Sequence, residues 1–256
     1  MFSKRKLAKQ PSRTLGATVT GEPYQPARIY FETPDPAALK GAFAQLKCID
    51  HDPAHDRWVW LWAHEAKKVQ LGIPREEIAR ELHPIVIGAF RFPRGGGVHL
   101  DLRSLLRVTA ALSFFREGLP EGALRPKRLR IVNRLFEVQE RPGPTDQKTH
   151  DHFFKASSVG PPLADLIVEK VRAQLQDVPL DFEKRLTAME QALEAAGRLP
   201  LPEVEEILLD EGEPGWIDSL VLTLRMRIAE AMAAWEGKPR VDWFKALRGQ
   251  VDLRTR

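Results

Sequence analysis

The sequence predicts an α+β protein in which an antiparallel or mixed β-sheet is followed by an α-helical region. Three observations lead to this expectation. Short β-branched and aromatic segments alternate with amphipathic helical segments up to about residue 140. The hydrophobic period is then helical from about residue 150 to residue 250. Hydrophobic residues make up 43% of the chain and charged residues 29%, which are ordinary values for a globular protein.

The first 25 residues are predicted to form a flexible basic arm. They contain several Pro and Gly residues and no hydrophobic period. Residues 1–21 hold five Lys or Arg residues and neither Asp nor Glu. We therefore divide the chain into an arm over 1–25, a sheet domain over 26–140 and a helical region over 150–250. The sequence leaves open whether the helical region packs on the sheet.

Within the sheet domain the predicted elements follow in a regular order. A strand over 28–33 precedes a helix that begins at the Pro-Asp-Pro segment 34–36. Two hairpins surround the loops 52–56 and 93–97, with a helix over 74–82 between them. This β-α-β-β-α-β order is that of a ferredoxin-like split βαβ sheet, in which the strand over 57–63 would lie beside the first strand. A helix from 104 and a strand over 127–138 would extend that sheet by a further βαβ unit.

Helical periodicity dominates after the loop at 141–144. Apolar residues spaced three and four apart predict helices over 163–175, 181–197 and 216–235, and shorter helices over 202–210 and 241–247. The segment 203–213 is rich in carboxylates, which is typical of a solvated helix face and would also suit a basic protein partner. The residues concerned are Glu203, Glu205, Glu206, Asp210, Glu211 and Glu213.

Charge is unevenly distributed along the chain, whose net charge is +4. Residues 103–148 carry ten Lys or Arg against five acids, whereas residues 164–236 carry seven against sixteen. This pattern fits either a polyanionic partner, such as RNA or single-stranded DNA, or attraction between the two parts of the chain. A single cysteine, Cys48, excludes an intramolecular disulfide. No segment is apolar enough to cross a membrane, so we expect a cytoplasmic protein without a membrane partner.

The most unusual segment of the sequence is an aromatic strand. Trp58, Trp60 and Trp62 alternate with smaller apolar residues, so the three indoles share one face of a strand. If the smaller residues face the helices, the indoles lie with Tyr30 on the helix-free face. Sheets with such aromatic faces stack single-stranded RNA bases. The alternative is that the C-terminal helices cover this face and bury the tryptophans.

A basic stripe accompanies the aromatic strand, because alternation places three arginines of the last strand on one face. The predicted nucleic-acid contacts are therefore the arm residues, the aromatic face and this stripe: Lys4, Arg5, Lys6, Tyr30, Trp58, Trp60, Trp62, Arg128, Arg130 and Arg134.

Clusters of His and Asp residues give a weaker signal. They occur over 50–56 and 150–152, but neither cluster has a recognised metal-ligand spacing. His99 and Asp101 share a strand face and could orient a general base, yet no nucleophile completes the set. We therefore assign no catalytic residue, metal ligand or cofactor, and expect a binding protein rather than an enzyme.

The leading functional hypothesis is a non-catalytic, nucleic-acid-associated binding or assembly subunit. One alternative is a protein-interaction or structural module that acts through the acidic C-terminal helices and binds no nucleic acid. A second alternative is a metal-dependent hydrolase that uses the His and Asp clusters.

Overall fold

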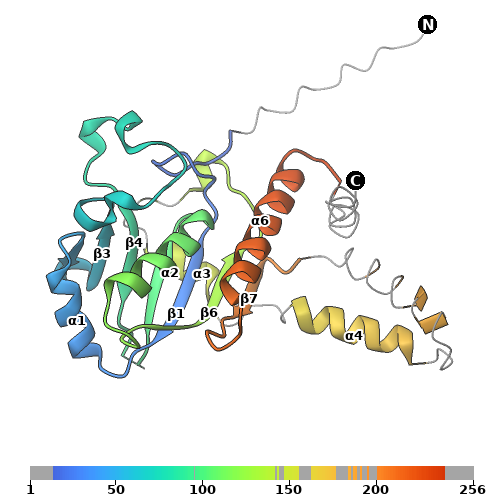
Figure 1. Cartoon of the computed structure of the whole chain (residues 1–256). Coiled ribbons are helices and arrows are strands. Elements are labelled where there is room, and N and C mark those ends of the chain that lie inside the picture. The colour runs from blue at the N-terminus through green and yellow to red at the C-terminus, as the bar shows by residue number, and fades with distance from the viewer. Residues whose placement is uncertain are drawn as a thin grey trace, which may run out of the picture.

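The computed structural model describes residues 14–94, 96–141, 143, 147–155, 163–176 and 201–239, with six separate positions between 184 and 195. Its centre is a seven-stranded sheet in the order β2-β3-β4-β5-β1-β6-β7 (Figure 1), and every neighbouring pair of strands is antiparallel. The α+β class is confirmed. The strands are β1 (Ala27–Glu32), β2 (Ile49–Asp52), β3 (Arg57–Leu61), β4 (Val86–Arg91), β5 (Val98–Leu102), β6 (Arg125–Val132) and β7 (Val204–Leu208).

Helices cover one face of the sheet over most of its width. In Figure 1, α2 and α6 lie in front of the strands, and α1 lies at the β3 end. Among the described residues, no helix is both long and apolar enough to span a bilayer. The helices are α1 (Pro36–Gln45), α2 (Leu106–Gly118), α3 (Gln147–Phe153), α4 (Leu163–Leu175) and α6 (Trp216–Trp235).

Several elements form where local sequence signals predict them. The two predicted hairpins are β2–β3 and β4–β5. Helix α1 begins as expected, because the Asp35 carboxylate accepts hydrogen bonds from the backbone N–H groups of Ala37 and Ala38. The helices expected over 163–175 and 216–235 are α4 and α6. The helix predicted over 241–247 lies outside the described residues, as does most of that over 181–197.

The strand order differs from the ferredoxin-like order. Strand β3 pairs with β2 and β4, and β1 pairs with β5 and β6. The cause lies between β3 and β4, where the predicted helix over 74–82 is replaced by short 3₁₀ turns at Arg75–Glu77 and Arg80–Leu82. Without a crossover helix the chain returns beside β3, where the Trp62 N–H donates to the Ile85 carbonyl at 2.8 Å.

The predicted helix over 202–210 is wrong, because this segment forms strand β7. It pairs antiparallel with β6, with Arg128 opposite Leu208 and Arg130 opposite Glu206. In this short segment Val204, Glu206 and Leu208 share one face, a period of two that competes with the helical reading. The C-terminal region therefore contributes a strand to the sheet as well as helices.

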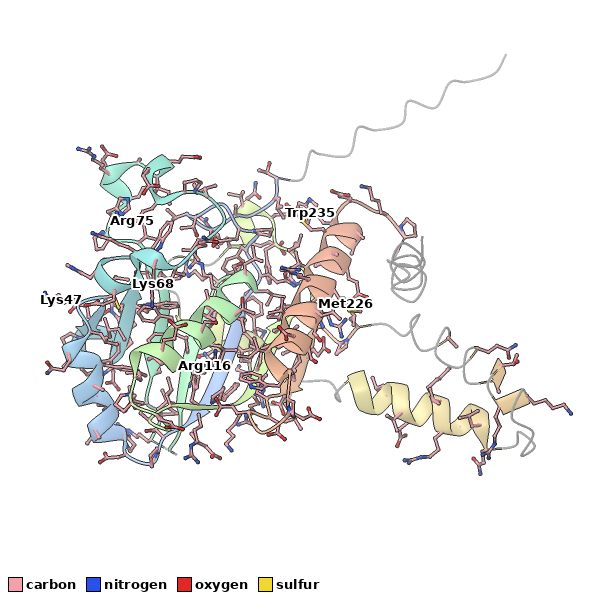
Figure 2. All side chains as sticks on the ribbon, in the orientation of Figure 1. Lys47, Lys68, Arg75, Arg116, Met226 and Trp235 are labelled. Carbon is pink, nitrogen blue, oxygen red and sulfur yellow. The ribbon has the colours of Figure 1, made fainter. Side chains whose placement is uncertain are left out.

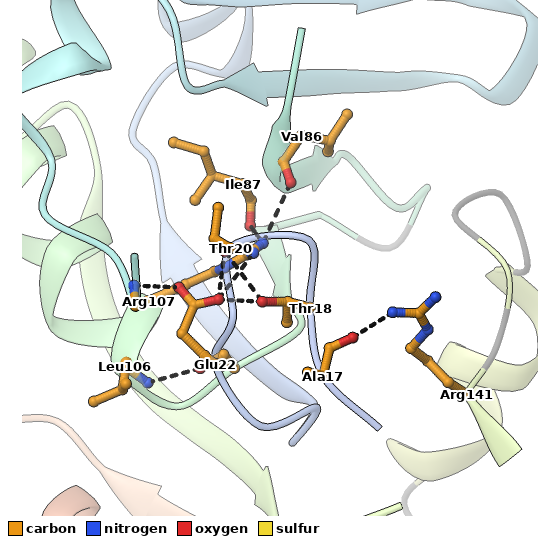
Figure 3. A network of polar contacts seen from close by, with 11 residues as sticks. Ala17, Thr18, Thr20, Glu22, Val86, Ile87, Leu106, Arg107 and Arg141 are labelled. Carbon is orange, nitrogen blue, oxygen red and sulfur yellow. Dashed lines mark hydrogen bonds and ion pairs between the residues drawn. The ribbon is translucent and has the colours of Figure 1, made fainter. Parts of the chain in front are cut away.

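Residues 14–25 are packed into the fold, so the flexible arm expected over 1–25 is wrong for this part. Residues 1–13 lie outside the described residues. Tyr24 is fully buried, and the Glu22 carboxylate lies beside the buried guanidinium of Arg107 on α2 (Figure 3). That guanidinium also donates to Thr20 Oγ1 at 2.6 Å and to the Ile87 carbonyl at 2.9 Å. The segment is therefore tied to both α2 and β4.

Candidate functional site

The two faces of the sheet have different characters. The apolar face packs against α1, α2 and α6, with Phe43, Phe115 and Leu224 from these helices in one core with strand residues. We call the opposite side the polar face. It carries the side chains of Arg28 and Tyr30 on β1, Arg57 on β3, Arg91 on β4, His99 and Asp101 on β5, Arg128 and Arg130 on β6, and Glu206 on β7.

The predicted place of the tryptophans is wrong. In the register of the sheet, Trp58 pairs with Phe90, Phe90 with Leu100, and Leu100 with Ile29. Paired residues lie on the same face, so the indoles share a face with Ile29 and not with Tyr30. This is the face that α1 and α2 cover. The indoles therefore belong to the core, but the helices that bury them are not the C-terminal ones.

Large aromatic rings fill the space between the sheet and helices α1 and α2, and the indoles are part of this packing. Trp60 is 0% exposed and lies 4.9 Å from Phe115 and 5.2 Å from Phe114, measured between ring centroids. Trp62 is 3% exposed and its Nε1 donates to the Val69 carbonyl. Trp58 packs against Phe43 of α1 at 5.9 Å. The three tryptophans are structural residues rather than a stacking surface.

Three of the predicted contacts do come together on the polar face. The Tyr30 ring has the Arg128 guanidinium carbon 4.5 Å and the Arg130 guanidinium carbon 5.0 Å from its centroid. Arg130 also donates from Nη1 to the Tyr30 hydroxyl at 3.2 Å. Because both guanidinium groups contact the ring, its π-electrons already interact with cations inside the protein. The Arg128 side chain is 44% exposed and is the most open part of this group.

The third arginine of the stripe and the arm residues are placed elsewhere. Arg134 follows the end of β6, stacks over the Phe136 ring at 3.8 Å and pairs with Glu140 and Glu203. Lys4, Arg5 and Lys6 lie outside the described residues.

A buried carboxylate, Asp101, organises the middle of the polar face. Arg28 donates to both of its oxygens, from Nε at 2.5 Å and from Nη2 at 3.1 Å. His150 Nε2 lies 3.2 Å from Oδ1, and His99 Nε2 lies 3.8 Å from Oδ2. Burial alone would raise the pKa of Asp101, but His150, Arg28 and His99 together hold it well below its ordinary value. The carboxylate is therefore ionised at neutral pH.

Helix α3 is attached to the polar face through this cluster. Asp151 accepts a hydrogen bond from Arg28, whose guanidinium carbon lies 5.0 Å from the Phe154 ring centroid. Arg130 donates to the Phe154 carbonyl at 2.8 Å. His150 is buried against the sheet, whereas His152 is exposed. The predicted His-Asp-His cluster over 150–152 is thus divided between an inner and an outer side of α3.

His99 lies between Tyr30 and Arg91 in the register of the sheet. Burial lowers its pKa to about 4, and the nearby Asp101 carboxylate only partly opposes this shift. The imidazole is therefore neutral at pH 7. Within the described part of the chain, its Nε2 is buried and makes no hydrogen bond. A neutral ring with a low pKa is a weak general base, so the geometry does not favour catalysis by His99.

Two of the six carboxylates of the acidic run are engaged within the fold, whereas Glu203, Asp210, Glu211 and Glu213 are exposed. Glu205 is buried and accepts hydrogen bonds from Arg227 of α6, from Nε at 2.6 Å and from Nη2 at 2.9 Å. Glu206 accepts from Arg130 Nε at 2.6 Å and lies 3.8 Å from Arg128 Nη1. These carboxylates are thus on a strand rather than on the expected helix, and they hold the basic stripe and α6 in place.

The other predicted His and Asp cluster, over 50–56, surrounds the β2–β3 turn. Asp52 accepts from Arg57 Nε at 2.9 Å and lies 2.8 Å from His55 Nδ1. His51 stacks against Trp58, with ring centroids 4.8 Å apart. In the residues that the structure describes, no group of three or more His, Cys, Asp or Glu side chains could hold a metal ion.

Sequence reasoning missed Arg28, Arg57, Arg91 and His150 as neighbours of the predicted site. Alternation alone puts each arginine on one side of its own strand, but only the strand order brings the strands together. Comparison with protein-family models, with curated proteins and with solved structures gives no match for this chain.

Proposed function

We propose that the chain is a non-catalytic protein that binds nucleic acid on the polar face of its sheet. One observation carries the proposal: a row of cationic and aromatic side chains crosses five neighbouring strands. In strand order the row contains Arg57, Arg91, His99, Tyr30 and Arg128. Guanidinium groups donate to phosphate oxygens and stack on bases, so a row of this composition suits a single strand laid across the sheet.

The tryptophans take no part in this proposal, because they are in the core. Contact with bases therefore depends on guanidinium planes, such as that of Arg128, which Tyr30 supports, and contact with phosphates depends on the arginines. The lysines and arginines of residues 1–13 add positive charge to the same chain. Electrostatic attraction then dominates the affinity, which should decrease steeply with salt.

Arg128 provides the sharpest test, because its guanidinium is the most exposed of the group around Tyr30. The full chain is titrated into labelled single-stranded RNA and DNA, followed by fluorescence anisotropy, at roughly 50 to 200 mM salt. Arg128→Gln should weaken binding to all sequences and reduce the slope of log K against log salt by about 1. Arg116→Gln, an exposed position on α2 (Figure 2), is the matched control and should leave both unchanged.

Absence of binding at low salt would refute the proposal, and so would equal effects of the two substitutions. A protein-interaction module remains the alternative, and it predicts a stable protein partner with no response to nucleic acid. Two carboxylates on which that alternative relies, Glu205 and Glu206, are engaged by arginines of the same chain.

A further inference from the structure

Arg91 has lost much of its hydration without gaining a close ion pair. Its side chain is 21% exposed, and its nearest carboxylate is Asp101, with 4.0 Å between Nε and Oδ2. Both oxygens of Asp101 already accept hydrogen bonds from Arg28. Among the described residues, the buried Nε of Arg91 has no hydrogen-bond partner. A desolvated cation in this state is stabilised by any anion that reaches it.

A second arginine lies beside Arg91. Trp58 pairs with Phe90, so Arg57, one position before Trp58, is next to Arg91, one position after Phe90, on the polar face. The Arg57 side chain is 13% exposed, and its Nε donates to Asp52. Within the described residues, its two terminal nitrogens make no hydrogen bond. Neighbouring strands are about 4.8 Å apart, so the two arginines leave the polar face side by side.

The pKa of the Arg91 guanidinium reflects both its burial and the charges around it. Burial lowers the pKa of the Arg91 guanidinium, Asp101 and Asp151 raise it, and the charges of Arg57 and Arg28 lower it further. The pKa of Arg91 is thus below its ordinary value, whereas that of Arg28, which has two carboxylate partners, is raised. On the polar face, Arg91 is thus a cation whose nearby carboxylates do not offset the effect of its burial.

We infer that Arg57 and Arg91 form a subsite for one phosphate group. Each planar guanidinium offers parallel N–H donors that match phosphate oxygens, and the two arginines stand beside each other on adjacent strands. The inference rests on the proposed function in one respect: the phosphate would belong to a nucleic-acid backbone that crosses the polar face. The subsite itself requires only a phosphate anion.

Inorganic phosphate is the probe for the subsite. Thermal unfolding of the full chain is followed in phosphate and in chloride at equal ionic strength, and calorimetric titration gives the affinity. Phosphate should raise the Tm of the unsubstituted chain and of Arg94→Gln, a control at an exposed arginine in the β4–β5 loop. Arg91→Gln should abolish this rise and weaken the affinity at least about tenfold. Arg57→Gln should have the same direction of effect.

The same variants show whether Arg91 is a structural residue. Without phosphate, Arg91→Gln should keep or raise the Tm, because it breaks no hydrogen bond among the described residues and removes a charge whose burial the nearby carboxylates do not offset. A lower Tm without phosphate would mean that Arg91 supports the fold, and it would count against the inference. A phosphate effect that is absent from the unsubstituted chain, or that survives in Arg91→Gln, would overturn it.

Oligonucleotide binding separates this inference from the proposed function. If oligonucleotides bind equally well to Arg91→Gln and to the unsubstituted chain, the subsite is refuted while nucleic-acid binding stands. If phosphate binds at Arg91 but no oligonucleotide binds, the subsite stands and the nucleic-acid proposal is refuted.

Discussion

Arg107→Met would leave a buried carboxylate without its cation. The Arg107 side chain is 2% exposed, and the Glu22 side chain beside it is fully buried, with 3.4 Å between Nη2 and Oε2. Removing one partner of such a pair costs about 3–5 kcal/mol, because the other charge stays buried and uncompensated. Urea unfolding at pH 7 should therefore show a loss of this size. Arg116→Met, at an exposed position on the same helix, should change stability by less than about 0.5 kcal/mol.

The pH dependence of this loss tests its cause. Burial raises the pKa of Glu22, but Arg107 and the hydroxyls of Thr18 and Thr20 more than offset this, so the pKa lies below the ordinary value of 4.5. The contribution of Glu22 to stability is thus present above pH 4.5 and decreases as the pH falls through the folded-state pKa. Without Arg107, burial dominates and raises the pKa of Glu22. Protonation of Glu22 in acid then removes the buried uncompensated charge of the variant. The difference between Arg107→Met and the unsubstituted chain should therefore shrink in acid.

A double substitution completes the test. Glu22→Gln removes the charge but keeps groups that can bond to Thr18 and Thr20. In the Arg107→Met background it should recover part of the lost stability, with a coupling energy of about 0.5–3 kcal/mol. The reasoning is wrong if Arg107→Met destabilises equally at pH 7 and pH 4, or if Glu22→Gln recovers nothing.

Three further predictions concern the other parts of the fold. Arg227→Met should destabilise the protein by about 3–5 kcal/mol, because it leaves the buried carboxylate of Glu205 on β7 without its cation. Arg225→Met, at an exposed position on the same helix, is the control. Equal losses of stability in the two variants would contradict the prediction. Trp60→Ala should cost about 3–5 kcal/mol in urea unfolding, whereas the exposed Leu222→Ala should cost less than about 1 kcal/mol. A small loss for Trp60→Ala would show that the indole is not in the core. The unfolded chain protonates His99 near pH 6.5 and the folded chain only near pH 4. As the pH decreases from 6.5 to 4, this residue should therefore lower the free energy of unfolding by up to about 1.4 kcal/mol per pH unit. His99→Gln should remove that part of the slope, and an NMR titration midpoint near 6.5 would contradict the reasoning.

Local elements could be predicted from the sequence, because their signals are local. The turn residues around 52–56 and 93–97 mark both hairpins, and Asp35 marks the start of α1. The long apolar period over 216–235 marks α6. Alternation along β6 also predicts Arg128 and Arg130 on one face, and the structure has both on that face.

The arrangement of these elements could not be predicted, because it depends on pairings between distant segments. Element order alone made β1 a neighbour of β3, whereas the connection over 62–85, whose helical parts are only 3₁₀ turns, lets β4 pair with β3. The tryptophans lie on the other face than predicted, because the indoles and not the smaller residues of β3 pack against the helices, whereas Tyr30 lies on the predicted face. Strand β7 has only five residues, too few to distinguish a period of two from a helical period, and its pairing with β6 decides its conformation.

The central place of β1 determines when the sheet can be completed during synthesis. Ala27 of β1 pairs with Leu102 of β5 and with Ile131 of β6, so the first strand has no partner until β5 exists and lacks its second partner until β6 exists. The neighbours β2 to β5 can form a meander of consecutive strands earlier. Before β5 exists, β1 has unpaired edges on both sides and an exposed apolar face that includes Ile29 and Phe31. Closure of the sheet around β1 is thus a late step with a large loop-closure entropy, and we expect folding to be slow and sensitive to aggregation before this step.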